Sequence, residues 1–131
     1  MALQKTKVLN ITSVTGIATV GILTAGVTPT DAGVAGTCYI RSVIMHNTGL
    51  GTARVSLYVN PDTNPVSVAT TANRILRIDL SSNETSFFES NYPIVLTPTD
   101  SLGVEITAPA SGGTGIGSAV NFLVNGDTDI S

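Results

Sequence analysis

Apolar residues recur at every second position along several short segments of the chain, a pattern typical of strands with one buried and one wetted face. The clearest segment is 52–59, in which the positions of the apolar face are Ala53, Val55, Leu57 and Val59. The turn residues of 47–51, NTGLG, precede it, and Asn and Gly tolerate the positive φ angles that branched residues avoid. We therefore expect residues 37–59 to form a β-hairpin around which the chain is organised.

The first strand of this hairpin carries apolar residues on both of its faces. Strict alternation divides it into one face with Cys38, Ile40 and Ile44 and another with Tyr39, Arg41, Val43 and Met45. A strand that is apolar on both sides is central in its sheet, is bulged, or is covered on its outer side by another segment or subunit.

The same period of two predicts further strands along the rest of the chain. They are expected at 17–24, 73–80, 85–89, 94–96, 101–107 and 119–125. Segments 25–36, 60–72 and 108–118 are rich in turn residues and are predicted loops, and no window shows helical spacing. About eight short strands predict an all-β fold, a two-sheet antiparallel β-sandwich. The loops exceed minimal hairpin turns, which favours a jelly-roll-like connectivity.

The length and charge of the chain fit one domain that belongs to an assembly. We expect 1–131 to form a single sandwich, with 1–12 as an N-terminal arm or first strand and 126–131 as a polar tail. Only 11% of the residues are charged, against about 25% in an average domain. A free monomer usually depends on a charged surface for solubility, so this composition favours a subunit that hides part of its surface.

The charge distribution and hydropathy argue against two classes of partner. The net charge is −3 and the six basic residues are dispersed, so we expect no nucleic-acid binding. Lys5 and Lys7 before the apolar stretch 14–27 imitate a signal peptide, but five Thr and Ser residues within 12–24 interrupt the region, and we expect no export signal. No stretch reaches the ~20 apolar residues of a membrane-spanning helix, so we expect no membrane partner.

Residues that carry chemistry are few. The single histidine, His46, and the single cysteine, Cys38, are separated by eight residues of one strand, ~26 Å, which is too far for a thiolate–imidazole pair. We expect Cys38 to be buried and inert, and His46 to be hydrogen-bonded at the entrance to a turn. The glycine-rich stretch 111–117 lacks the lysine of a P-loop and precedes a strand. We therefore expect a non-enzymatic protein without catalytic residues, cofactor or metal.

Two pairs of residues keep alternatives open. Asp127 and Asp129 carry the oxygen ligands that Ca²⁺ prefers, but a solvated tail explains them equally. Phe87 and Phe88 are adjacent, so one points inward and the other outward in a strand. The outward ring is covered either by the same chain or by another subunit. In the second case we expect an interface that contains this ring, Leu123 and either Val43 or Met45.

Two stretches resemble small virion proteins of tailed bacteriophages. They are residues 39–48, YIRSVIMHNT, and residues 53–60, ARVSLYVN. The shared pattern is a strand that ends in a polar corner of the type His/Cys-Asn-Thr, followed by a Val-Ser-Leu-Tyr strand. The start Met1-Ala2-Leu3, the abundance of Thr, Gly and Ala, and the all-β size also resemble capsid decoration (cement) proteins. The resemblance covers mainly residues 37–60 and carries over no functional residue.

The resemblance implies a structural subunit on the outside of an icosahedral capsid, as a homotrimer that bridges subunits of the major capsid protein. It also implies synthesis in the host cytoplasm and a final location on the capsid surface. In that role residues 2–12 are an arm across a neighbour or the shell, which adds Leu3 and Val8 to the expected interface.

The alternative is a tail, fibre or collar module that attaches to host glycans or to other virion proteins. Sugar sites usually use exposed aromatic platforms, whereas this chain has no Trp and three scattered tyrosines. A small β-sandwich hydrolase is a third class, for which the chain offers no recognisable catalytic set.

Overall fold

A computed structural model shows an all-β protein. It describes residues 3–27, 29–30, 33–34, 36–60, 71–107 and 119–129. These residues form ten strands and no helix, and therefore contain no helix that is long and apolar enough to cross a membrane. The predicted all-β class is confirmed. Residues 61–70 of the predicted loop 60–72, and the whole predicted loop 108–118, lie outside the described residues.

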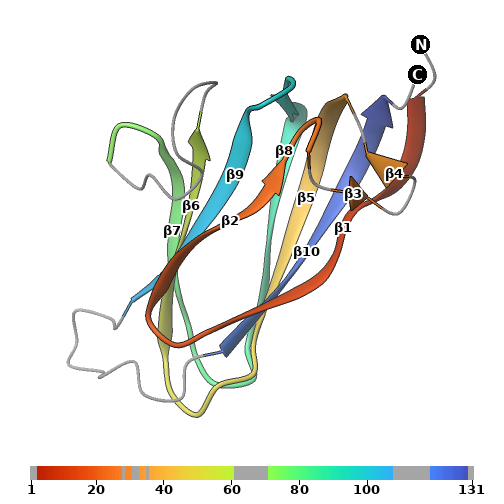
Figure 1. Cartoon of the computed structure of the whole chain (residues 1–131). Coiled ribbons are helices and arrows are strands. Elements are labelled where there is room, and N and C mark those ends of the chain that lie inside the picture. The colour runs from red at the N-terminus through yellow and green to blue at the C-terminus, as the bar shows by residue number, and fades with distance from the viewer. Residues whose placement is uncertain are drawn as a thin grey trace.

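Eight of the strands form two four-stranded antiparallel sheets that face each other (Figure 1). Sheet A has the order β1-β10-β5-β8 and sheet B the order β2-β9-β6-β7, while β3 and β4 pair as a small ribbon. The bounds are β1 (Leu3–Thr15), β2 (Ala18–Thr24), β3 (Pro29–Thr30), β4 (Gly33–Val34), β5 (Thr37–Asn47), β6 (Ala53–Asn60), β7 (Arg74–Leu80), β8 (Thr85–Leu96), β9 (Ser101–Thr107) and β10 (Ala119–Asp129).

The strand pairing is that of a jelly roll. β1 pairs with β10, β2 with β9, β5 with β8, and β6 with β7, so the second half of the chain retraces the first in reverse order. The pairs β10·β5 and β9·β6 then complete the two sheets. This is the double-sheet connectivity that the loop lengths favoured.

The predicted hairpin at 37–59 is wrong. β5 lies in sheet A between β10 and β8, and β6 lies in sheet B between β9 and β7, so residues 48–52 cross from one sheet to the other. A period of two identifies a strand and its buried face, but it does not say which sheet the strand joins. Both strands are central, which explains why both are rich in buried side chains.

The first strand of that segment is both central and bulged. Register shifts interrupt its pairing with β8 between Ile40 and Ser42, and its pairing with β10 between Asn125 and Gly126. The bulge reverses the alternation, so that Val43 and Met45 are buried on the same face as Cys38 and Ile40. The prediction that they lie on opposite faces is therefore wrong. At Gly126 a Cβ would overlap the carbonyl oxygen of Tyr39, so this position requires glycine.

The inner faces of the two sheets form one core. Most of the core residues in β6, β9 and β10 were predicted correctly. The alternation in β6, β9 and β10 places the expected residues inside, all with exposed fractions of 0%: Ala53, Val55, Leu57, Leu102, Val104, Ile106, Val120, Phe122 and Val124. Residues from both sheets join in this core. Stacked inner faces of this kind bury the apolar side chains that drive folding.

The ends of the chain are more regular than expected. Of the two alternatives for the N-terminal segment, the structure forms the strand, because β1 pairs with β10 from Leu3 to Thr15. β10 continues to Asp129, beyond residue 125 where the pattern predicted its end.

The predicted strands 85–89 and 94–96 are parts of one strand, β8, whose pairing with β5 is interrupted opposite the bulge.

Candidate interaction surface

The outer face of sheet A carries a continuous row of apolar side chains across its four strands. Ile44 of β5 pairs in register with Leu123 of β10 on one side and with Phe87 of β8 on the other. Ile11 of β1 lies beside Leu123, within the register shift between Leu9 and Thr12. We call Ile11, Leu123, Ile44 and Phe87 the apolar band. Its two ends are the most exposed, at 68% for Ile11 and 63% for Phe87.

A shallow hollow accompanies the band over β1, β10 and β5. It has a volume of about 240 Å³ and is lined by Ile11, Ile44, His46, Asn121, Phe122 and Leu123. Most of these lining residues are apolar, and Phe87 is not among them. Phe87 instead projects at the other end of the row, on the edge strand β8.

Polar residues border the band on both sides. On one side, Nδ1 of His46 is hydrogen-bonded with Oγ1 of Thr85 across β5 and β8 at 2.6 Å. On the other side, the amide of Asn125 donates to Oγ of Ser42 at 3.5 Å. An apolar centre with a polar border is the organisation of protein–protein interfaces. The expectation of a hydrogen-bonded His46 near the end of its strand is confirmed.

The structure brings two of the expected interface residues together on this surface. Phe87 points outward and Phe88 packs against the core, as adjacent strand positions require. Leu123 joins Phe87 in the band. Val8, Val43 and Met45 are instead fully buried between the sheets. The side chain of Leu3 lies outside the described residues.

Sequence reasoning missed Ile11 and Ile44. Ile44 was grouped with Cys38 and Ile40 because strict alternation was assumed, whereas the bulge places it on the outer face. The adjacent pair Phe87-Phe88 gave the correct signal for this face, because one ring of such a pair must point outward.

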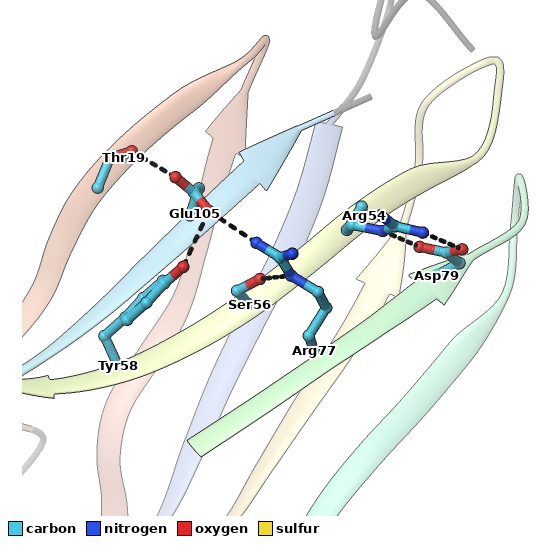
Figure 2. Close-up of polar contacts among 7 residues, drawn as sticks. All are labelled: Thr19, Arg54, Ser56, Tyr58, Arg77, Asp79 and Glu105. Atoms are coloured by element: carbon cyan, nitrogen blue, oxygen red, sulfur yellow. Dashed lines mark hydrogen bonds and ion pairs between the residues drawn. The ribbon is translucent and has the colours of Figure 1, made fainter. Parts of the chain in front are cut away.

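The outer face of sheet B carries a network of polar side chains (Figure 2). One row of residues in register crosses its four strands, formed by Thr19, Glu105, Ser56 and Arg77. Glu105 accepts hydrogen bonds from the hydroxyl of Tyr58 at 2.9 Å and from Thr19 at 3.4 Å, and it pairs with Nη2 of Arg77 at 3.6 Å. Nε of Arg77 donates to Oγ of Ser56 at 3.0 Å.

A second ion pair on the same face joins β6 to β7. Arg54 donates to both carboxylate oxygens of Asp79, with Nε–Oδ1 at 2.8 Å and Nη2–Oδ2 at 3.1 Å. These hydrogen bonds lower the pKa of Asp79 and raise that of Arg54. The charges of this face thus compensate one another across neighbouring strands.

The remaining candidate groups are engaged or buried. Burial raises the pKa of the Cys38 thiol to about 11, so the sulfur is protonated at neutral pH. Asp127 accepts hydrogen bonds from Nε of Arg41 at 3.2 Å and from Nη2 at 3.1 Å. Within the described ranges, no three His, Cys, Asp or Glu side chains gather closely enough to hold a metal ion.

Comparisons with known proteins identify no family. No family model and no curated protein matches the chain. Among solved structures, the chain is similar to one in the structure of infectious bursal disease virus, Gt strain, with a TM-score of 0.41 and 8% sequence identity. The match covers 96% of this chain and 32% of the other, so this chain spans about a third of the viral chain. A similarity at this level does not identify a function.

Proposed function

We propose that the protein is a non-enzymatic structural subunit of a virion, which decorates and stabilises a bacteriophage capsid by bridging subunits of the major capsid protein. The observation that carries the proposal is the apolar band, which crosses one whole sheet and has exposed ends at Ile11 and Phe87. The resemblance of residues 37–60 to phage virion proteins supports the choice of assembly. In this proposal the protein acts as a homotrimer on the capsid surface.

The band is large enough to contribute usefully to an assembly. A phenylalanine side chain of ~200 Å² that is 63% exposed, as Phe87 is, leaves ~125 Å² for a partner to cover. At ~25 cal/mol per Å² this burial favours association by ~3 kcal/mol before the costs of association are subtracted. Ile11, which is exposed to a similar degree, adds to this gain.

Addition of the purified protein to phage heads assembled without it tests the proposal. We expect saturable, stoichiometric binding and greater resistance of the heads to heat and to low salt. Phe87→Asp is expected to weaken binding, whereas Tyr92→Asp serves as the matched control, because Tyr92 is an exposed aromatic residue of the same strand outside the band.

Absence of binding, or binding that leaves the heads no more resistant, contradicts the proposal. Binding to a glycan array without binding to heads favours the tail, fibre or collar alternative. Equal binding of Phe87→Asp and Tyr92→Asp would show that the band is not the surface used.

A further inference from the structure

We propose that Leu50 is a second contact point of the protein, an apolar anchor that enters an apolar socket on one capsid subunit while the apolar band contacts another. The inference rests on the proposed function, and it identifies how one copy reaches two capsid subunits. A protein that bridges two subunits needs two contact surfaces, whereas the band supplies only one.

Leu50 is the most exposed of the large apolar side chains that the structure describes, at 88%. It lies in the crossing between β5 and β6, and its two neighbours, Gly49 and Gly51, have no side chains that could cover it. The fold does not require glycine at position 51, because its φ angle is not positive and a Cβ there would meet no atom within 4 Å. Leu50 therefore stands clear of the rest of the chain.

Hydrogen bonds hold the backbone on both sides of Leu50. The fully buried side chain of Asn47 accepts from the N–H of Gly49 at 2.8 Å and donates to the carbonyl oxygen of Gly51 at 2.8 Å. The hydroxyl of Ser82, from the β7–β8 turn, donates to the carbonyl oxygen of Gly49 at 2.6 Å. A side chain presented on a fixed backbone gives up less conformational freedom on binding, so this corner is preorganised for a contact.

The corner lies at the end of the sandwich away from the chain termini (Figure 1). The register places it there, because Asn47 pairs with Val120 at the start of β10, whereas Leu3 pairs with Asp129 at the other end. Ile44 of the band precedes Asn47 by three residues, which is ~10 Å along β5. The band covers the outer face of sheet A, whereas the corner crosses between the sheets. Two surfaces placed in this way can contact two partners at once.

The outer face of sheet B is less suitable as the second surface. Its side chains Glu105, Arg77 and the Arg54–Asp79 pair are held in hydrogen bonds or ion pairs along neighbouring strands. Covering them would remove water from charged groups that already have partners, which is costly. Leu50 carries no such cost.

The surroundings of Leu50 fit a socket on a protein rather than a lipid surface. The described connections at this end are residues 16–17, 48–52 and 81–84, and their only charged side chain is that of Glu84. Attachment to anionic lipid depends on clustered Lys and Arg, which these segments lack. The other exposed polar side chains of 48–52 and 81–84 are hydroxyls and one amide. An apolar centre with a neutral polar border is the organisation of protein–protein contacts.

Binding of substituted proteins to phage heads tests the anchor. We expect Leu50→Asp to bind roughly 10- to 30-fold more weakly, the effect of leaving one leucine unburied. The heads should then gain no resistance to heat, because the band alone does not bridge. The matched control is Val27→Asp, since Val27 is an apolar residue with 64% exposure in the turn after β2, at the other end of the sandwich. Both variants should keep the urea stability of the wild type, because both side chains lie in solvent.

Photochemical cross-linking identifies what Leu50 contacts. A benzoylphenylalanine at position 50 is expected to form an adduct with the major capsid protein on illuminated heads, and the same residue at position 27 to form none. A chain that carries benzoylphenylalanine at both 50 and 87 is expected to give a product that contains two capsid subunits.

Equal binding of Leu50→Asp and Val27→Asp would overturn the inference. It would also be overturned if position 50 gave no adduct while position 87 gave one, if it reacted with another copy of this chain, or if positions 50 and 87 reached the same capsid subunit. Flotation of the wild type, but not of Leu50→Asp, with phosphatidylcholine vesicles would assign Leu50 to a membrane instead. A wild type that binds heads while Leu50→Asp binds equally well contradicts only the anchor, whereas a wild type that binds no heads contradicts the virion role and the anchor with it.

Discussion

Asn47 joins two connections between the sheets, and its replacement by alanine is expected to destabilise the protein strongly. The fully buried side chain donates to the carbonyl oxygens of Gly51 at 2.8 Å and Leu80 at 2.9 Å, and accepts from the N–H of Gly49 at 2.8 Å. Its backbone pairs with Glu84 and Asn83. The β5–β6 crossing and the β7–β8 turn are thereby fixed to each other.

The size of the expected loss in the free energy of unfolding follows from the groups that Asn47→Ala leaves without a partner. Two of the three lost hydrogen bonds, those to Leu80 and Gly49, lie in buried surroundings. Each buried group that loses its partner costs ~1–3 kcal/mol, so we expect a loss of ~3–5 kcal/mol in the free energy of unfolding. Total stabilities of domains are only ~5–15 kcal/mol, so a large fraction would be lost.

Urea denaturation followed by circular dichroism measures this loss. The control is Ser82→Ala, because the exposed Ser82 donates to the Gly49 carbonyl at 2.6 Å at the same corner, and water can replace it. We expect that control to cost less than ~1 kcal/mol. A loss no greater in Asn47→Ala than in Ser82→Ala would refute the reasoning.

A second substitution separates the lost donors from the lost volume. Asn47→Asp keeps the acceptor for Gly49 but turns a carboxylate toward the carbonyl oxygens of Gly51 and Leu80. This environment raises the pKa of the introduced carboxyl, so the variant loses stability relative to wild type as pH rises from ~4 to 7. A pH-independent difference would argue against this account.

Three further outcomes are expected. Gly126→Ala should cost more than ~2 kcal/mol, because its Cβ overlaps backbone, whereas Gly51→Ala, whose Cβ meets no atom within 4 Å, should change urea stability by less than ~0.5 kcal/mol. Arg54 lowers the pKa of Asp79, so the ionised carboxylate stabilises the fold above the unfolded pKa of ~4, and this effect fades as the pH falls. In acid unfolding curves the free energies of unfolding of wild type and Asp79→Asn should therefore converge at low pH. The thiol of Cys38 has its pKa raised from 9.0 to about 11, so wild type should lose stability relative to Cys38→Ala as pH rises through that window; parallel pH profiles would contradict the burial.

Local alternation predicted the strands and most of the core. Residues such as Leu57, Val104 and Phe122 could be assigned to the interior because their neighbours two positions before and after them are also apolar. Sheet membership could not be predicted in this way, since β5 and β6 have the pattern of partners but belong to different sheets. That information lies in long-range pairing, which a short window of sequence does not contain.

The bulge in β5 explains why the candidate surface was only partly predicted. One shifted residue near Ser42 exchanges the faces of Val43, Ile44 and Met45, so two buried residues were expected outside and one outer residue inside. Gly126 was a signal for this irregularity, because an isolated glycine within a strand often marks a bulge. The sequence pattern expected Leu123 and one ring of the Phe87–Phe88 pair on an outer face without saying which ring, and the structure shows that the outer ring is Phe87.

The position of β10 in sheet A has a consequence for the order in which the chain folds. This last strand lies between β1 and β5, so residues at the two ends of the chain, such as Leu3 and Asp129, are direct partners. Until it arrives, β1 and β5 each present an unpaired edge to a gap in the sheet, a state that invites pairing with other chains. During synthesis the sandwich can therefore close only after the C-terminal strand has left the ribosome. Pairing so distant in sequence also makes folding slow, on the order of milliseconds to seconds.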